Sequence, residues 1–232
     1  MKRIYVSPSS QEENLYAAGG TNEAEQCRKI ALVLVEELRR CGFEARTEVT
    51  PGKTMYDRVA QSNVWQADAH IPIHSNAFDG KVAGFRGFGY DTQSEGYRLA
   101  GAIMQTLAPL MPGTSDGLSA QPQLYEVKAT DAPCAYLEIG FHDNPEEAQF
   151  IIDHTKDIAR AICLGICDYF GREYVPERAL FSDVPTDAWY APAVRWAVEE
   201  GIVKGVDEDH FAPDRFCTRA EVVAMLHRLA QQ

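Results

Sequence analysis

The first part of the chain is predicted to be an α/β domain, a mixed central sheet layered by helices, and the last part a small, mainly helical domain. Short apolar runs of strand character alternate with amphipathic stretches over residues 3–171, and this alternation produces a sheet covered by helices. A polar stretch with two prolines at 172–185 then interrupts the pattern, as linkers do. These observations predict domains at 1–172 and 181–232, joined by a linker at 173–180.

Each predicted strand is a short run of buried character bounded by glycine, proline or polar residues. The strands are expected at 3–7, 43–49, 69–77, 84–92 and 134–141. The helices have apolar residues at helical spacing and are expected at 22–42, 54–65, 94–110 and 144–171. In the first helix Ile30, Leu34 and Leu38 form one apolar face, and Gly42 stands where a glycine cap belongs.

The C-terminal domain is expected to hold two helices, one within 189–205 that ends at Gly201 and one within 206–230. Thr218 and Glu221 have the spacing of a capping box, which marks the start of the second helix. A domain this short has a marginal core. Packing on the first domain, self-association or a ligand would therefore have to stabilise it.

The composition is that of a globular protein with an acidic balance. Of 232 residues, 45% are hydrophobic and 24% charged, and the formal net charge is −12. Nucleic acids and anionic membrane surfaces select basic patches, so neither is an expected partner. No apolar run approaches the roughly 18–20 residues of a membrane-spanning helix, and the first residues lack the apolar core of a secretory signal.

The six cysteines show neither C-x-x-C pairs nor zinc-finger spacing. Cys134 falls in a predicted strand, and Cys163 and Cys167 fall in the last helix of the first domain. Because free cysteine behaves as a small apolar residue, buried free thiols are expected in preference to disulfides.

Two histidines, His70 and His74, bracket an Ile-Pro-Ile sequence in the third predicted strand. On a strand they share a face but lie about 13 Å apart, because each residue advances the chain by about 3.3 Å. One metal ion, about 2.0–2.1 Å from each ligand nitrogen, cannot bind both. His74 precedes a Ser-Asn-Ala loop at the strand end, where α/β proteins place their chemistry, so it is the better ligand candidate. His70 is expected to be structural.

Two acidic residues accompany His74 as candidates. Glu138 lies in the apolar segment Tyr-Leu-Glu-Ile-Gly-Phe, where an unpaired carboxylate is costly to bury and where burial raises its pKa toward that of a general base or acid. A strand-end carboxylate that reaches solvent is the alternative. Glu23 opens the first long helix, a position that the helix dipole alone favours for an acid.

The order of these segments resembles the zinc-dependent N-acetylmuramoyl-L-alanine amidases of the amidase-3 family. The resemblance rests on Tyr-Val-Ser-Pro in the first strand, the helix-opening Glu23, the Ile-His-Ser-Asn-Ala segment and Leu-Glu-Ile-Gly-Phe-His-Asp-Asn. It implies hydrolysis of the amide between the lactyl group of N-acetylmuramic acid and the L-alanine of the peptidoglycan stem peptide. It also implies that Glu23 and His74 bind zinc and that Glu138 is the catalytic acid and base.

The first zinc histidine of that family has no counterpart here. Ser10 or Gln11 holds its place after the first strand, and no histidine precedes His70. A catalytic zinc normally has three protein ligands, and a glutamine carbonyl is a poor one. His142, four residues after Glu138, is therefore the candidate third ligand. Its alternatives are a role in substrate orientation and a plain surface position.

Residues 181–229 resemble a single S-layer homology module. The resemblance rests on the Thr-Arg-Ala-Glu tetrad at 218–221 and on the Phe-x-Asp-Val, Trp-Tyr and Gly-Ile-x-Lys-Gly segments before it. Such modules attach proteins to secondary cell-wall polysaccharide. By this resemblance Arg219 contacts the glycan, and Trp189 offers either an aromatic face to a sugar ring or a core side chain. The protein is accordingly expected outside the cell, at the wall.

Three functions are consistent with these patterns. The two resemblances favour a zinc-dependent hydrolase of peptidoglycan, acting in wall remodelling or in lysis. The missing histidine favours a non-catalytic cell-wall-binding protein with a degenerate amidase fold. A zinc peptidase of related fold is the third, although no segment suggests a peptide-specific pocket.

Overall fold

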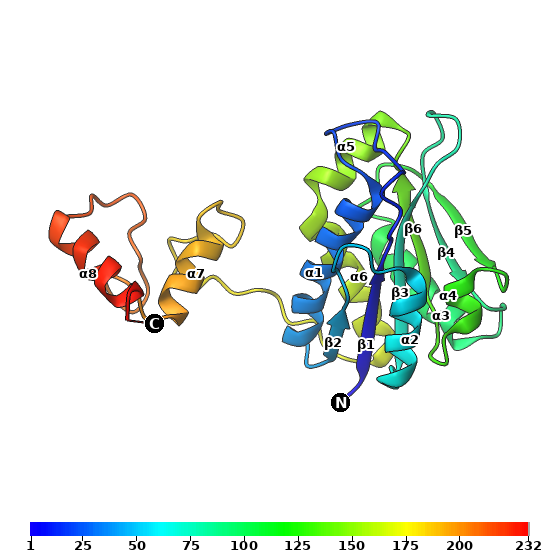
Figure 1. Ribbon diagram of the computed structural model, residues 1–232, viewed down its shortest axis with the longest axis horizontal. Coiled ribbons are helices and arrows are strands. Elements are labelled where there is room, and N and C mark those ends of the chain that lie inside the picture. The colour runs from blue at the N-terminus through cyan, green and yellow to red at the C-terminus, as the bar shows by residue number, and fades with distance from the viewer. Residues whose placement is uncertain (232) are drawn as a thin grey trace. The chain divides into compact units, whose positions relative to one another are not determined.

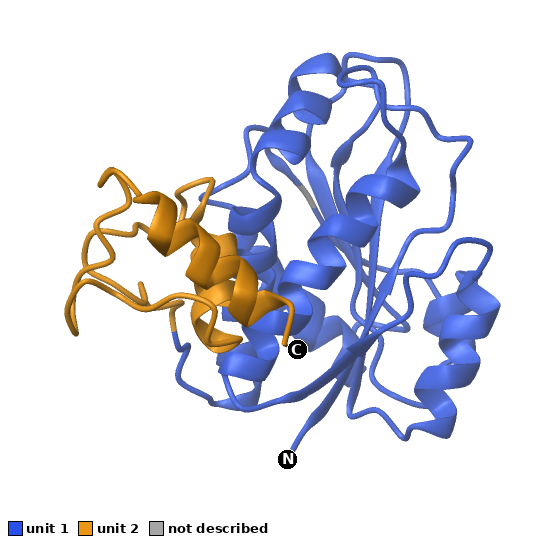
Figure 2. Cartoon of the chain, turned by 60° about the vertical axis from the view of Figure 1, so that its left-hand side comes forward, with its two compact units in different colours: residues 1–175 blue, residues 176–232 orange. Residues whose placement is uncertain are grey.

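The computed structural model describes residues 1–231. The chain forms two compact units, Met1–Val175 and Pro176–Gln232, which Figure 2 colours separately. The division between them falls inside the stretch predicted to be a linker. No helix in the described part of the chain is long and apolar enough to cross a membrane.

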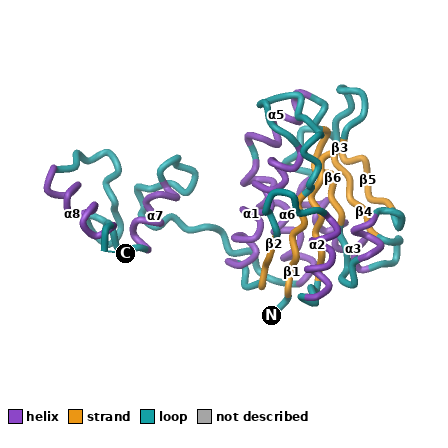
Figure 3. The backbone as a smooth tube through the Cα atoms, viewed as in Figure 1, coloured by secondary structure: helices purple, strands orange, loops and turns teal. Residues whose placement is uncertain are grey.

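Unit 1 alternates strands and helices around one sheet (Figures 1 and 3). Its strands are β1 (Arg3–Pro8), β2 (Glu44–Thr47), β3 (Ala69–Asn76), β4 (Phe85–Gly89), β5 (Ser115–Ala120) and β6 (Tyr136–Phe141). Its helices are α1 (Glu23–Arg40), α2 (Met55–Val64), α3 (Glu95–Leu107), α4 (Tyr125–Ala129), α5 (Pro145–Asp153) and α6 (Thr155–Phe170). The predicted α/β class is confirmed.

Three elements differ from the sequence-based expectation. The structure adds β5 and α4, which periodicity did not predict because β5 is a mostly polar edge strand and α4 is little more than one turn. The helix expected at 144–171 is two helices, because His154 leaves the helical region with φ −111° and ψ 26°. Apolar spacing continues across that break, so the sequence pattern carries no sign of it.

The sheet has six strands in the order β2-β1-β3-β6-β4-β5. Strand β1 pairs in parallel with β2 and β3, and β3 pairs in parallel with β6. Strand β4 runs antiparallel to β6, which makes the sheet mixed as predicted. Because β1, β3 and β6 are parallel, their carboxyl ends meet at one edge, where α/β proteins place their ligands.

The two faces of the sheet carry different helices. On β1, Ile4 and Val6 belong to the main core together with residues of α1, α3 and α6. Tyr5 points to the opposite face, because successive strand residues alternate, and its hydroxyl donates to Gln61 of α2 at 2.9 Å. His70 and His74 share that second face, since Ile71 and Ile73 between them are in the main core.

Unit 2 contains α7 (Ala191–Glu199) and α8 (Arg219–Leu229). Its core is a small cluster of Phe181, Val184 and Val194. The predicted capping box is present at the start of α8. The Thr218 hydroxyl accepts from the Glu221 backbone N–H, and the Glu221 carboxylate accepts from the Thr218 backbone N–H. No residue of α8 is buried, and Leu226 is 59% exposed.

Candidate active site

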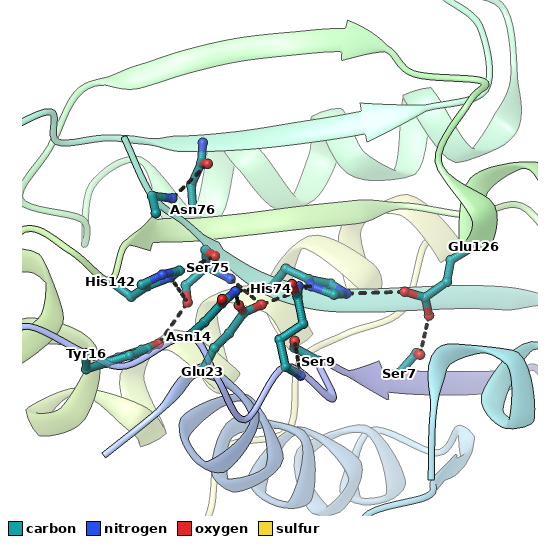
Figure 4. Close-up of polar contacts among 12 residues, drawn as sticks. Ser7, Ser9, Asn14, Tyr16, Glu23, His74, Ser75, Asn76, Glu126 and His142 are labelled. Carbon is teal, nitrogen blue, oxygen red and sulfur yellow. Dashed lines mark hydrogen bonds and ion pairs between the residues drawn. The ribbon is translucent and has the colours of Figure 1, made fainter. Parts of the chain in front are cut away.

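Residues predicted from three separate segments meet at the carboxyl edge of β1, β3 and β6 (Figure 4). In the β3–β6 ladder His74 lies directly opposite Glu138. Glu23 reaches the same point from the first turn of α1, which starts there because the Asn22 side chain caps it by accepting from the Glu25 backbone at 2.9 Å. The structure therefore brings Glu23, His74 and Glu138 together.

The buried carboxylate of Glu23 faces the His74 ring. Its Oε1 lies 3.0 Å from His74 Nδ1, and its Oε2 accepts from Asn14 at 2.6 Å. Burial by itself would raise the pKa of Glu23, but the hydrogen bonds from His74 and Asn14 lower it below the ordinary value. Glu23 is thus an ionised carboxylate that accepts a hydrogen bond from His74.

His74 is held by a carboxylate at each ring nitrogen. Nδ1 faces Glu23, and Nε2 lies 3.2 Å from Oε2 of Glu126. The ring also stacks on Tyr136 with centroids 4.7 Å apart. Burial would lower the pKa of His74, but the bonds to Glu126 and Glu23 outweigh it and raise the pKa to about 10.

Glu126, on α4, was not among the residues predicted for the site. Its Oε1 lies 3.2 Å from His70 Nε2 and accepts from the Ser7 hydroxyl, so one carboxylate joins both histidines of β3. Burial opposes ionisation of Glu126, yet its bonds to His70 and His74 lower its pKa to about 2. The signal that could have found it is an acid flanked by apolar residues in Leu-Tyr-Glu-Val, the same signal that marked Glu138.

Glu138 is the carboxylate of the site with a buried oxygen that has no hydrogen-bond partner among the described residues. Its Oε2 atom is buried and makes no hydrogen bond with any described residue. Burial is the main reason that its pKa rises to about 7, with His74 lowering the pKa and Glu23 raising it. A carboxyl group that titrates near neutrality can exchange protons with a substrate in both directions.

Neutral side chains hold the place of the missing histidine. Gln11 Nε2 lies 3.4 Å from His74 Nδ1, and Gln11 Oε1 accepts from Asn14 at 3.2 Å. Ser9 is buried beside them and hydrogen-bonds to Glu23. The segment after β1 therefore lines the site but supplies no charged group or imidazole to it.

His142 is buried at the same edge, where its ring faces Ser75 (Figure 4). Its Nδ1 lies 3.0 Å from the Ser75 carbonyl oxygen and 3.1 Å from the Ser75 hydroxyl, and its ring stacks on Tyr16. Glu23, His74 and His142 do not form a group whose ligand atoms all lie within 4.8 Å of one another. The structure thus does not assemble the three predicted ligands around one point.

Comparison with known families identifies unit 1. A family model described as N-acetylmuramoyl-L-alanine amidase matches residues 8–168, most of the chain. The chain belongs to this amidase family. A second model, the S-layer homology domain, matches residues 180–223.

Individual proteins agree with both matches. The germination-specific N-acetylmuramoyl-L-alanine amidase of Bacillus subtilis (strain 168) is 26% identical over 189 residues, covering 73% of this chain and 80% of that protein. The surface-layer 125 kDa protein of Lysinibacillus sphaericus is 46% identical over 46 residues, 20% of this chain and 4% of that protein.

The fold has close counterparts among solved structures. The catalytic domain of CwlV, an N-acetylmuramoyl-L-alanine amidase from Bacillus (Paenibacillus) polymyxa var. colistinus, superposes with a TM-score of 0.67. It is 18% identical and covers 75% of this chain and 100% of that domain. At this identity the match shows a shared amidase fold.

The amidase family is generally zinc-dependent, and the side chains at the site include atoms that can bind this ion. Tetrahedral ligand atoms at about 2.0–2.1 Å from zinc lie about 3.3–3.4 Å apart. Glu23 Oε1 and His74 Nδ1 are 3.0 Å apart, and both are ligand types that zinc prefers. The amidase site therefore offers two of the three protein ligands that a catalytic zinc usually has, and the neutral side chain of Gln11 lies beside them.

In the S-layer homology unit the two predicted glycan-contacting residues lie on the surface. Trp189 is 90% exposed, so it is not a core residue of unit 2. Arg219, the first residue of α8, lines a shallow pocket with Ala220, Val223, Ala224 and His227. Trp189 does not line that pocket.

Proposed function

We propose that this amidase hydrolyses the amide between the lactyl group of N-acetylmuramic acid and the L-alanine of the peptidoglycan stem peptide. The observation that carries the proposal is the unpaired, buried Oε2 of Glu138 beside the Glu23–His74 pair. An unsatisfied carboxylate oxygen in a buried site is destabilising. The missing hydrogen bond is explained if this oxygen accepts a proton from the attacking water or donates one to the substrate.

Glu138 is the proposed acid and base of the reaction. Because its pKa is raised to about 7, the carboxylate takes a proton from the attacking water near neutral pH. The same group then returns that proton to the leaving amine nitrogen of L-alanine. The paired carboxylates of Glu23 and Glu126 stay ionised, because hydrogen bonds lower the pKa of each.

Glu23 and His74 are the proposed zinc ligands. When bound, zinc supplies Lewis-acid polarisation of the amide carbonyl and a lowered pKa for water. Glu126 orients the His74 ring through Nε2, which leaves Nδ1 directed at Glu23. His142 stays a proposed third ligand, and because Ser75 occupies its Nδ1, it would bind through Nε2.

A second function is supported by one specific observation. Gln11 and Ser9, rather than an imidazole, line the site next to His74. A protein that binds the wall without cleaving it has no need of the third ligand. In that case unit 1 is a degenerate amidase that serves as a scaffold.

Metal content and hydrolysis together separate the two functions. We expect His74→Ala to hold one equivalent of zinc less than wild type, because it loses the ion at the Glu23–His74 pair. Glu138→Gln should keep that ion while hydrolysis of a muramoyl-peptide falls about 10²–10⁴-fold, the usual contribution of general acid–base catalysis. His142→Ala reports whether that histidine is a ligand. Elemental analysis and release of free amine are the measurements.

Two controls match these variants within unit 1. His154→Ala removes a histidine that pairs with Asp157 at the surface, and Glu36→Gln removes an exposed carboxylate of α1. Both should retain zinc and activity. A wild type that takes up no zinc at the Glu23–His74 pair and cleaves nothing would establish the scaffold function instead.

We further propose that unit 2 attaches the protein to secondary cell-wall polysaccharide, with Arg219 and Trp189 contacting the glycan. The S-layer homology match supports this, as does the exposure of both side chains. An exposed tryptophan face is a common stacking surface for sugar rings, and a guanidinium can bind an anionic glycan bidentately. This attachment would place the amidase at the cell wall.

A further inference from the structure

Three cysteines form a buried cluster at the end of unit 1 opposite the amidase site. Cys41 is the C-cap of α1, and Cys163 and Cys167 lie one turn apart on the same face of α6. All three side chains are buried, and their sulfur atoms lie within 4.8 Å of one another. Among the described residues, this is the one group of three or more potential ligands that meets that distance.

We propose that Cys41, Cys163 and Cys167 bind a single thiophilic metal ion with a filled d shell, such as Zn²⁺. Three sulfurs at about 2.3 Å from zinc lie about 3.8–4.0 Å apart, whether the angles at the metal are tetrahedral or trigonal. Cys163 Sγ and Cys41 Sγ are 3.8 Å apart. Thiolates select zinc, monovalent copper and related soft ions over magnesium or calcium.

The surroundings of the cluster suit thiolate ligands. The Val175 backbone N–H donates to Cys41 Sγ at 3.3 Å, a hydrogen bond of the kind that orients metal ligands. Binding releases three thiol protons to solvent, so three thiolates and a divalent ion carry one net negative charge. Arg172 and Asp168 both act electrostatically on Cys167: the positive charge of Arg172 opposes that net charge, and the negative charge of Asp168 adds to it.

The thiol cluster is separate from the amidase site. Glu23 begins α1 and Cys41 follows its last residue, so the 18-residue helix places them about 27 Å apart. A metal at the cluster would link the C-terminal end of α1 to α6. It would also hold Val175, the last residue of unit 1, because the Val175 backbone hydrogen-bonds to Cys41. Its role is to fasten the point at which the chain leaves the catalytic unit.

Cadmium titration of the full chain tests the proposal, because a cadmium–thiolate bond has its own ultraviolet charge-transfer band. The protein is stripped with a chelator, reduced with a phosphine and titrated with Cd²⁺. We expect a thiolate band that saturates at one equivalent. Cys41→Ala and Cys163→Ser should weaken that binding by at least the roughly 10–100-fold that loss of even a supporting residue causes at metal sites.

Cys27→Ser is the matched control, since Cys27 is a buried cysteine of α1 that lies outside the cluster. It should keep the full band, and so should His74→Ala, which removes a proposed ligand of the amidase site. If the cluster variants fail to fold by circular dichroism, X-ray absorption of cadmium-loaded wild type decides the question. Sulfur neighbours around cadmium support the site.

Two results would overturn the proposal. One is the absence of a thiolate band in reduced wild type, in which case the cysteines are core residues joined by S–H···S contacts. The other is a cadmium shell of oxygen and nitrogen alone. Loss of zinc in His74→Ala with the thiolate band retained would separate the amidase zinc from the cluster metal.

Discussion

A single carboxylate determines what the two histidines of β3 do. The spacing of His70 and His74 rules out a shared metal ion, and the structure shows what they share instead. Glu126 places one oxygen at 3.2 Å from His70 Nε2 and the other at 3.2 Å from His74 Nε2. His70 contacts the carboxylate that holds His74, which is consistent with the structural role expected for it, whereas Nδ1 of His74 faces Glu23.

The raised pKa of Glu138 predicts the pH dependence of hydrolysis. A base acts in its ionised form, which predominates above its pKa, so kcat/KM should rise with pH and level off above a midpoint of about 7. A pH–rate profile on a soluble muramoyl-peptide measures that midpoint. A limb centred near the ordinary carboxyl value of 4.5 would show that Glu138 is not the base.

At the scale of elements, the close crossing of α3 and α6 depends on one glycine. A Cβ atom at Gly165 would lie 2.4 Å from the Cα atom of Ile103 on α3. Helices that approach this closely leave no room for a side chain, and backbone atoms cannot yield as a flexible side chain can. Gly165 therefore sets how α6 packs in the core beneath the sheet.

Gly165→Ala should destabilise unit 1 although alanine is the better helix former. The added methyl group overpacks the core, which costs about 1–3 kcal/mol. Alanine gains only about 1 kcal/mol in helix propensity over glycine, so the net effect on the free energy of unfolding is a loss. Thermal unfolding followed by circular dichroism measures the change. In the control, Gly101→Ala, the new Cβ meets only the tip of Leu118 at 3.3 Å, so equal losses in both variants would contradict the argument.

At the scale of the whole molecule, the proposed chemistry and the proposed attachment belong to different units. The proposed catalytic residues lie within Met1–Val175, and the S-layer homology match lies within Pro176–Gln232. Unit 2 has a small core, and α8 contributes no buried residue to it. The marginal core expected from its length is therefore what the structure shows.

This division predicts that wall attachment can be weakened without loss of hydrolysis. Arg219→Ala should reduce the affinity for purified wall fragments about tenfold or more, since hydrogen bonds to charged groups contribute about 1.5–3 kcal/mol. Hydrolysis of a small soluble substrate should be unchanged. Co-sedimentation measures binding, with Arg195→Ala on α7 as the control, and equal binding by both variants would remove Arg219 from the glycan surface.

Local patterns in the sequence were sufficient for much of this protein. Alternating apolar patterns predicted the α/β class, and the Thr218–Glu221 spacing predicted the capping box of α8, because each depends on residues a few positions apart. Glu23 and His74 were singled out at a helix start and a strand end, and Glu138 as a lone acid in an apolar strand, whereas their roles were implied by the family resemblance. The family match agrees with that prediction of the domain.

Contacts between distant residues were decided only by the tertiary structure. Glu126 reaches His74 across 52 positions, and Cys41 meets Cys163 across 122. His142 turns toward Ser75 instead of His74, which depends on how β3 and β6 pair at an irregular step after His74. The sequence by itself determined which groups stand at the ends of strands and helices. Packing of the sheet and its helices decided which of those groups touch, because pairing free energies at long separation depend on geometry that no local pattern contains.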